Sequence, residues 1–221
     1  MTCEGFGCQD TTQDGTLLQG CDTIYAVNRE HYSNTWEKIQ NSRQLLDILD
    51  SYKIPSSVDI VLSGGEPLIY ASDDVFVEFL QELHKRGHKI CFETNGSIGV
   101  DFEAFPIYKE CIFALSIKLL NSGESYKKRV DAKVISSLAS KSKEAFFKFS
   151  IDAKSINADL EKEIQEILSY APNTQIYCMP VAYDKLELEK NTPALIEFCK
   201  TKAYTFSDRL HIRVWNDKKG I

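Results

Sequence analysis

Apolar and polar positions along this 221-residue chain alternate between two periods. Short apolar runs of strand length are separated by segments in which apolar residues return at helical spacing. The apolar runs predict strands at residues 58–62, 89–94, 112–118, 146–151, 175–178 and 210–214. The helical spacing predicts helices near residues 45–52, 72–86, 130–142, 160–168 and from 192 onward. This repeated βαβ order is typical of a parallel sheet or barrel.

Local signals mark the ends of the predicted helices. Ser72 is suited to cap the amino end of the second helix, and Gly87 to end it in a left-handed conformation. Thr192 is suited to cap the amino end of the last helix, and Pro193 to occupy its first position. Residues up to about Asn34 show neither period and are predicted to form a polar loop. Functional groups are expected after the predicted strands, because the carboxyl ends of parallel strands lie at one edge.

Composition limits the classes of function. Apolar residues make up 43% of the chain and charged residues 26%, as in an ordinary globular protein, and the length favours one domain over residues 1–221. A formal net charge of −6 opposes binding to nucleic acid, which needs a surplus of Lys and Arg on one face. No apolar stretch is long enough to cross a bilayer, and the first residues form no signal peptide. We therefore expect a cytoplasmic protein with a small-molecule substrate and no membrane partner.

The seven cysteines fall into two groups. In a cytoplasmic chain, buried thiols or metal ligands are expected in preference to disulfides. Four cysteines lie within apolar strand or helix patterns, where a thiol packs as a small hydrophobe: Cys91, Cys111, Cys178 and Cys199. The other three lie in the polar amino-terminal stretch, where packing does not explain them: Cys3, Cys8 and Cys21.

A Ser-Gly-Gly-Glu-Pro run, residues 63–67, directly follows the first predicted strand. Two adjacent glycines let the backbone approach a ligand without an intervening Cβ, and Glu66 offers a carboxylate to a cation. An ordinary turn followed by an acidic residue is the alternative. The run resembles the Gly-Gly-Glu-Pro motif of radical S-adenosylmethionine enzymes, whose backbone binds the cofactor's methionine group. The resemblance also implies three cysteines that hold a 4Fe-4S cluster and leave one iron open to that methionine group.

Further segments extend the resemblance over nearly the whole chain and narrow it to the 7-carboxy-7-deazaguanine synthase family. They are residues 20–26, 63–68, 93–96, 115–118 and 213–217. The resemblance implies an α/β fold, a partial, modified (β/α) barrel of the radical S-adenosylmethionine type that commonly pairs as a homodimer. The implied reaction converts 6-carboxy-5,6,7,8-tetrahydropterin to 7-carboxy-7-deazaguanine with loss of ammonia, in queuosine and 7-deazapurine biosynthesis. The implied reductant is a partner such as flavodoxin.

The resemblance gives two residues a role beside the cluster. Cys21 corresponds to the last cluster ligand, and Thr23 to a residue that helps to hold a magnesium ion against the substrate carboxylate. The alternative for Asp22 and Thr23 is a capping or turn pair.

The resemblance assigns four more residues to contacts with the cofactor or the substrate. Ser63 is expected to approach the substrate, and Gly65 the methionine group of S-adenosylmethionine. Ser116 and Lys118 are expected at the ribose or carboxylate of that cofactor. Lys118 also fits an ordinary surface lysine at the end of a strand.

The amino-terminal segment departs from the family pattern. Members carry a strand and a substrate-binding segment before a Cys-x3-Cys pair, so we expect this chain to start internally and to lack that segment. In one alignment Cys3 is the second cysteine of the pair and its partner falls before Met1, so that Cys3 and Cys21 are cluster ligands and residues 4–20 form an inserted Ω-like loop. In the other, Cys3, Cys8 and Cys21 form a complete triad with relaxed spacing. Met179 also stands where many members have glutamine at a cofactor contact.

Two other functions are compatible with parts of the sequence. A radical activase, which generates a glycyl radical on another protein, shares the cluster and the Gly-Gly-Glu-Pro turn but lacks the Cys21–Thr23 segment. A truncated, non-catalytic remnant would instead bind zinc through its cysteines, with His31 as a fourth ligand. His84 and His88 are predicted to be solvated at a helix end, and no histidine is needed for the radical chemistry.

Overall fold

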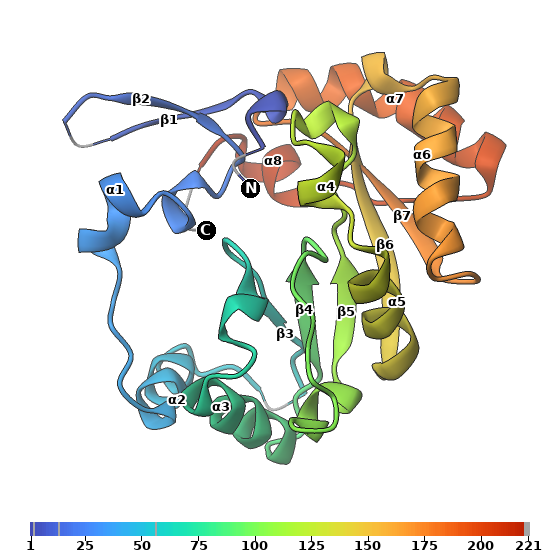
Figure 1. Cartoon of the computed structure of the whole chain (residues 1–221). Coiled ribbons are helices and arrows are strands. Elements are labelled where there is room, and N and C mark those ends of the chain that lie inside the picture. Colours follow the sequence, from blue (N-terminus) through green and yellow to red (C-terminus); the bar gives the residue numbers. More distant parts are fainter. Residues whose placement is uncertain (2, 13, 56, 219–221) are drawn as a thin grey trace.

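A computed structural model of the chain describes residues 1, 3–12, 14–55 and 57–218. Within this range, six parallel strands form one sheet in the order in which they occur along the chain (Figure 1). They are β3 (Ile60–Leu62), β4 (Ile90–Thr94), β5 (Ile112–Leu115), β6 (Glu144–Ile151), β7 (Gln175–Pro180) and β8 (Thr205–Phe206). A sequential order is that of a barrel and not of a doubly wound sheet. The predicted α/β partial barrel is confirmed.

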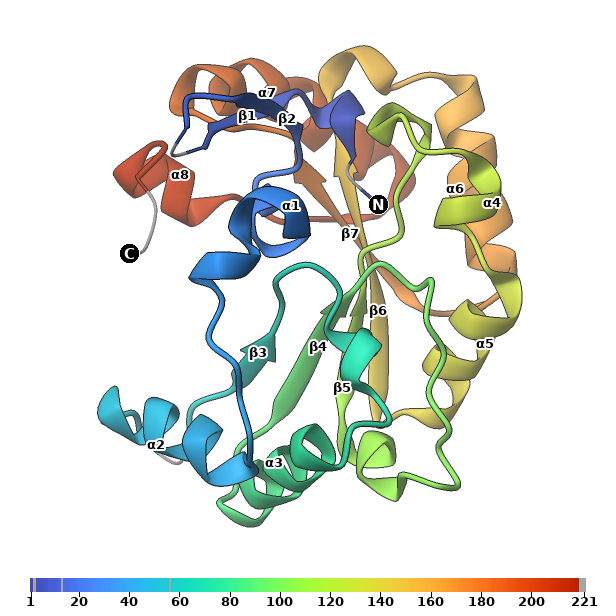
Figure 2. The same cartoon turned by 60° about the vertical axis from the view of Figure 1, so that its left-hand side comes forward.

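Helices connect the strands and cover one side of the sheet (Figures 1 and 2). The longer ones are α2 (Ser42–Ser51), α3 (Asp74–Lys85), α5 (Ala132–Lys141), α6 (Ala158–Ser169) and α7 (Lys185–Lys202). The shorter ones are α1 (Arg29–Tyr32), α4 (Tyr126–Arg129) and α8 (Leu210–Trp215). Short 3-10 helices lie at Glu4–Phe6, Ile24–Ala26, Ser33–Thr35, Pro67–Tyr70, Pro106–Glu110, Leu120–Ser122 and Ala153–Ser155.

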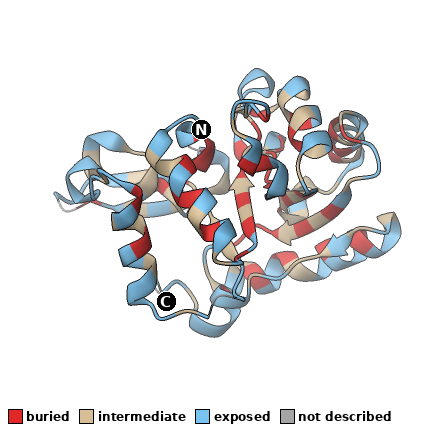
Figure 3. Ribbon diagram, turned by 90° about the horizontal axis from the view of Figure 1, so that it is seen from below, coloured by how far each residue is buried: buried red, intermediate tan, exposed pale blue. Residues whose placement is uncertain are grey.

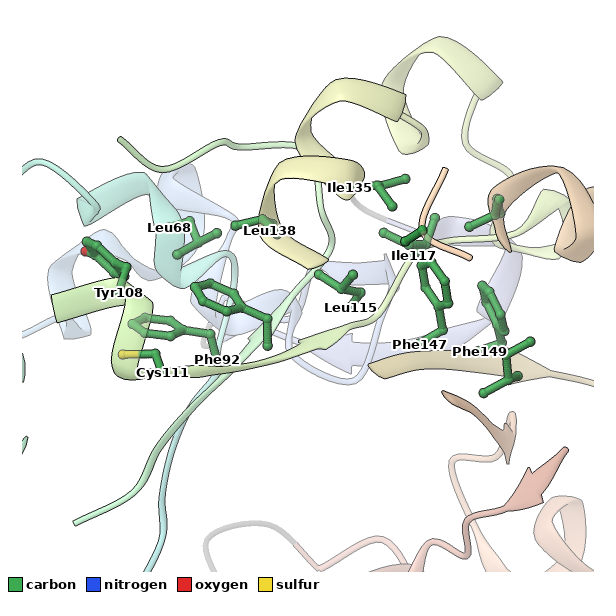
Figure 4. Packing of buried hydrophobic residues seen from close by; sticks show 14 of the residues in the cluster. Leu68, Phe92, Tyr108, Cys111, Leu115, Ile117, Ile135, Leu138, Phe147 and Phe149 are labelled. Atoms are coloured by element: carbon green, nitrogen blue, oxygen red, sulfur yellow. The ribbon is translucent and has the colours of Figure 1, made fainter. Parts of the chain in front are cut away.

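A continuous apolar core lies between the strands and these helices (Figures 3 and 4). Phe92 of β4 stacks on Phe113 of β5, with ring centroids 5.2 Å apart and planes inclined by 16°. Each such fully buried side chain contributes on the order of 1.5–3 kcal/mol. All seven cysteines lie in the described part of the chain and are free, and those predicted for the core are buried or, for the first, half-buried: Cys91, Cys111, Cys178 and Cys199.

The amino-terminal segment is more ordered than the sequence predicted. Instead of an Ω-like loop, residues 4–20 contain a 3-10 turn and an antiparallel hairpin of β1 (Cys8–Thr11) and β2 (Leu17–Gly20). Its strands are short, and in neither sequence do apolar and polar residues alternate, so the pattern that reveals a half-buried strand is missing. Buried Thr12 closes the turn, because its hydroxyl accepts a hydrogen bond from the Thr16 amide over 2.9 Å.

The carboxyl-terminal strand prediction is wrong. Residues 210–215 form α8, in which Ile212 is buried against Ala182 and Leu188 of a small separate cluster. The sheet position beside β7 is taken by β8, which pairs with Tyr177 and Cys178. The alternating apolar residues of the segment therefore match the period of a strand, but the segment folds as a helix outside the sheet.

Three local predictions are also corrected. The amino-end cap of α3 is Asp73 and not Ser72, since the Asp73 side chain accepts from the Phe76 amide. Helix α7 begins after Asp184 and continues through Pro193, which stands inside it. His88 is buried and its Nδ1 lies 2.9 Å from the Val58 carbonyl oxygen, so it is not solvated.

Candidate active site

The predicted site residues surround one cavity of about 250 Å³. It lies at the carboxyl edge of the parallel strands, under the amino-terminal segment and next to α8. The residues carried over from the family all line it: Cys3, Cys21, Thr23, Ser63, Gly65, Ser116 and Lys118. Their chemical roles stay predictions, but the fold brings together residues that are far apart in the sequence.

Cys3 is held in place by the loop that follows β5. Its amide donates to Glu124 Oε1 over 3.2 Å, and its backbone is left-handed with φ of 54°. Two residues later, Gly5 packs so closely that a Cβ there would lie 2.3 Å from the Asn121 carbonyl oxygen. Only a residue without a side chain allows this approach. The first described residues are therefore fixed against residues 121–124.

Cys8 and Cys21 are brought together by the hairpin. Cys8 on β1 is paired with Gly20 on β2, and Cys21 follows directly. Cys21 Sγ lies 3.3 Å from the hydroxyl oxygen of Thr23. Burial raises the pKa of the Cys3 thiol to about 11, although Lys118 opposes the rise. Burial, reinforced by Asp22, likewise raises the pKa of Cys8 to about 11.

The two glycines of the Gly-Gly turn have different surroundings. Gly64 has φ of 99° and open space where a Cβ would lie, so its backbone faces the cavity freely. A Cβ on Gly65 would instead lie 2.6 Å from Val27 Cγ1. The second glycine therefore lets the turn pack against the chain that follows Cys21 and Thr23.

The carboxylate of Glu66 is engaged by donors of the protein itself. Its Oε1 accepts from the Thr94 hydroxyl over 2.7 Å and from the Leu68 amide over 3.1 Å. Its Oε2 accepts from the Asn95 amide over 2.8 Å. The carboxylate thus joins the turn after β3 to the end of β4, and charge-assisted bonds of this kind are strong.

Ser116 and Lys118 form one polar wall of the cavity. The Lys118 ammonium donates to Ser116 Oγ over 3.0 Å, and the Ser116 amide donates to the Thr94 carbonyl over 2.7 Å. The Lys118 carbonyl accepts from Arg129 Nη1 over 3.1 Å. Lys118 is therefore directed into the site by its backbone, and the surface-lysine interpretation is not supported.

The sequence did not point to every residue of the site, and Arg209 and His211 are examples. Arg209 precedes the segment predicted as a strand and His211 lies within it; both line the cavity, and neither was assigned a role. Arg209 Nη2 donates to Asp22 Oδ2 over 2.5 Å, while its buried Nε has no hydrogen-bond partner among the described residues. Burial opposes ionisation of Asp22, but Arg209 outweighs it and lowers the pKa of Asp22. Burial and then Arg209 lower the pKa of His211.

The donor groups fit a cluster better than a single metal ion. Among the described residues, no group of three or more His, Cys, Asp or Glu is placed to hold one metal ion. In a 4Fe-4S cluster each thiolate binds a different iron, so its ligands need not converge on one point. Cys3, Cys8 and Cys21 all line one cavity, as the cysteines of such a site would. His31 does not line the cavity, and its Nδ1 lies 3.1 Å from Asn28 Oδ1.

No helix in the described ranges combines the length and apolar character needed to span a membrane.

No family model matches the chain. Solved structures that share its fold include the following two. QueE from Escherichia coli superposes with a TM-score of 0.57 and 17% identity over 86% of this chain and 78% of that one. Streptococcus suis SuiB bound to S-adenosylmethionine superposes with a TM-score of 0.56 and 15% identity over 86% of this chain and 47% of that one.

Curated relatives identify the enzyme type. The 7-carboxy-7-deazaguanine synthase of Rhodopirellula baltica is 26% identical over 215 residues, which is 90% of this chain and 75% of that protein. The synthase of Halobacterium salinarum is 26% identical over 209 residues, or 85% and 77% of the two chains. The resemblance predicted from the motifs is confirmed, and the chain is an enzyme related to the 7-carboxy-7-deazaguanine synthases.

Proposed function

We propose that this chain is a radical S-adenosylmethionine lyase that converts 6-carboxy-5,6,7,8-tetrahydropterin to 7-carboxy-7-deazaguanine and ammonia. The supporting observation is that the residues expected at the cluster, the cofactor and the substrate line a single cavity. The similarity to synthases named for this product supports the same reaction. Substrate and product differ only by ammonia, so the conversion needs no net oxidant.

The cofactor side of the cavity combines an unobstructed stretch of backbone with a hydroxyl and an ammonium group. When bound, the cluster supplies the electron that splits S-adenosylmethionine. Gly64 offers unobstructed backbone to the methionine group, while Gly65 keeps the turn against Val27. Ser116 and Lys118 lie 3.0 Å apart through Oγ and Nζ and suit a ribose hydroxyl and a carboxylate.

The substrate carries a carboxylate, and the cavity supplies cations for it. Arg209 is nine-tenths buried and its Nε has no partner among the described residues, so it can still bind an acceptor. Lys148 is already paired with Glu93 over 2.6 Å and is a weaker candidate. Ser63 adds a hydroxyl at the same edge. We assign the carboxylate to Arg209 and the polar ring edge to Ser63.

Magnesium is proposed only together with the substrate. Thr23 and Asp22 supply oxygen atoms, but Asp22 is engaged by Arg209, so the described residues do not form a magnesium site by themselves. Magnesium usually keeps several waters and uses oxygen atoms of the substrate. Binding of the ion is therefore expected to require the pterin carboxylate, and no step of the reaction is assigned to it.

The alternative functions have less support. A zinc-binding remnant needs a fourth ligand, and His31 lies away from the three thiols on the cavity. A glycyl-radical activase has no counterpart among the named curated relatives. The homodimer, the flavodoxin-like reductant and the cytoplasmic location stay predictions from the sequence.

Turnover of the pterin tests the proposal directly. The purified chain is reconstituted anaerobically with iron and sulfide, reduced with dithionite and incubated with S-adenosylmethionine, magnesium and the tetrahydropterin. We expect 7-carboxy-7-deazaguanine by mass spectrometry, with a loss of about tenfold or more in Lys118→Met. Lys89→Met is the matched control, because Lys89 is exposed at the opposite end of β4. Cluster formation without any product would contradict the proposed reaction.

A further inference from the structure

We infer that Arg129, the last residue of α4, is a positioning residue for the cofactor and acts through the backbone of Lys118. Arg129 does not line the cavity, whereas Lys118 does. The inference rests on the proposed function, in which Lys118 contacts bound S-adenosylmethionine. It adds to that function a residue that belongs to none of the sequence motifs.

The backbone at Lys118 lies beyond the end of the sheet. Strand β5 ends at Leu115, and the Ser116 amide still donates to the Thr94 carbonyl of β4. Residues 117–119 continue as neither strand nor helix. The Lys118 carbonyl accepts from Arg129 Nη1 over 3.1 Å. A lysine side chain is flexible, so the point from which its ammonium group reaches into the cavity is set by this support of its backbone.

Arg129 is itself fixed on several sides. Its side chain is 4% exposed and forms a buried ion pair with Glu163 of α6, which is 11% exposed. Its Nε donates to the Glu124 carbonyl over 3.1 Å. The other carboxylate oxygen of Glu163 accepts from the Leu120 amide over 3.1 Å. The pair therefore holds the backbone of residues 118–124 at three points.

This arrangement depends on the shape of a guanidinium group. Its Nε and Nη1 donors leave one rigid plane in different directions, and they reach the carbonyls of Glu124 and Lys118 at the same time. The donors of a lysine all leave a single nitrogen. Arg129→Lys is therefore expected to keep the ion pair with Glu163 and to lose support of the backbone, although the charge is unchanged.

The same guanidinium supports a second residue of the cavity. Glu124, whose carbonyl Arg129 holds, accepts from the Cys3 amide through Oε1 over 3.2 Å. Cys3 and Lys118 both line the cavity. A buried cation outside the site thus fixes the backbone of two residues within it.

The first test asks whether Arg129 acts through Lys118. The anaerobically reconstituted chain is titrated with S-adenosylhomocysteine, an analogue without a sulfonium group, and binding is measured by calorimetry. We expect Arg129→Lys to bind the analogue roughly tenfold more weakly than the wild type, because the ammonium group of Lys118 is displaced. In the Lys118→Met background the same change is expected to cost about twofold or less, because coupled residues are not additive.

Arg86→Lys is the matched control for the first test. Its exposed pair with Asp50 lies away from the cavity, so wild-type affinity is expected. Equal losses from Arg129→Lys with and without Lys118 would overturn the inference, because they would show an effect that does not pass through this lysine. Wild-type affinity in Arg129→Lys would overturn it as well.

The second test separates positioning from stability. Arg129→Met/Glu163→Met removes both charges, and replacing a buried ion pair by apolar side chains of similar volume commonly preserves stability. The Lys118 carbonyl is still left without its donor. We expect urea unfolding close to that of the wild type, with the analogue still bound about tenfold more weakly. Wild-type affinity in this variant, or affinities that follow the order of stability among the variants, would overturn the inference.

These outcomes separate the inference from the proposed function. Binding of the analogue without turnover of the pterin contradicts the reaction, while a coupled cycle still supports the role of Arg129. Turnover by the wild type together with an additive cycle supports the reaction and contradicts the inference. A wild-type chain that does not bind the analogue contradicts both.

Discussion

The segment that carries the three cavity thiols and the sheet below it are built in different ways. The sheet surrounds a continuous apolar core in which Phe92, Phe113 and Phe147 are fully buried. In described residues 1–34, burial is limited to Cys3, Thr12, Gly20 and Ile24, and the hairpin lies beyond the carboxyl ends of the strands (Figures 1 and 2). The sheet is stabilised by burial, whereas the thiol-bearing segment depends on a few polar and backbone contacts with loops.

One buried ion pair supports the contact between these regions. Arg129 pairs with Glu163, and the two side chains are 4% and 11% exposed. Arg129 also donates to the carbonyls of Lys118 and Glu124, and Glu163 Oε2 accepts from the Leu120 amide. The pair therefore fixes the loop that aims Lys118 into the cavity and holds Cys3. The position of Cys3 is therefore set by the loop after β5, whereas Cys8 and Cys21 are placed by the hairpin of their own segment.

The largest effect is expected from removing one partner of that pair. Arg129→Met leaves Glu163 buried without its cation and two carbonyls without a donor, so we expect a loss of about 3–5 kcal/mol in the free energy of unfolding. Urea unfolding followed by circular dichroism measures it. Arg86→Met is the control, because its pair with Asp50 is 32% and 49% exposed and should be worth about 1 kcal/mol or less. Similar losses in the two variants would contradict a dominant role for the buried pair.

A smaller and local effect is expected from Gly5→Ala. The new Cβ would lie 2.3 Å from the Asn121 carbonyl oxygen and 2.7 Å from the Gly123 nitrogen, both in the backbone. Relief requires residues 3–7 to move away, at a cost of about 1–3 kcal/mol. We expect faster proteolysis before residue 20 and a lower iron content, with the thermal midpoint of the sheet unchanged. A matching fall in that midpoint would show that the two regions unfold as one.

The sheet was predictable from the sequence because buried strands and helices repeat their apolar residues at a regular spacing. The buried strands β4 to β7 and helices α5 and α6 coincide with predicted segments, since their apolar residues face one continuous core. The failures lie where that core ends. The hairpin strands do not alternate apolar and polar residues, and residues 210–214 do alternate but fold as α8, which buries Ile212 in a small separate cluster.

The part of the candidate site that belongs to a sequence motif was predictable. The part that is formed by tertiary contacts was not. The Gly-Gly-Glu-Pro run located the cavity, but the use of Glu66 as a bridge to Thr94 and Asn95 has no sequence signal. Arg209 enters the site only because the chain turns back after β8 to meet Asp22. Such a pair spans most of the chain, and no spacing rule connects its members.

A substitution of Gly65, the second glycine of the motif, tests the contact between the Gly-Gly turn and the chain at Ala26 and Val27. Gly65→Ala places a Cβ 2.6 Å from Val27 Cγ1, a stiff side chain, and 3.1 Å from the Ala26 carbonyl oxygen. We expect a cost of about 1–2 kcal/mol, expressed as roughly tenfold weaker binding of S-adenosylmethionine by calorimetry. Gly99→Ala is the matched control, because its Cβ would make an ordinary 3.6 Å contact with Val134. Equal affinities in the two variants would exclude this packing as a requirement for the cofactor.

The smallest effect is expected where the hairpin meets α1. The Tyr32 hydroxyl donates to Asp10 Oδ2 over 2.8 Å, and Asp10 lies on β1 beside the cysteine-bearing end. Tyr32→Phe removes this hydrogen bond, which is worth about 0.5–1.5 kcal/mol, and leaves the ring in place. Hydrogen exchange should quicken by roughly three- to tenfold at the β1 and β2 amides and stay unchanged in β5, because only the polar region loses support. Tyr25→Phe is the control, since the half-exposed Tyr25 makes no hydroxyl hydrogen bond within the described residues. Faster exchange in β5 as well would mean that the hairpin and the sheet open together, and the thiols would then share the stability of the core.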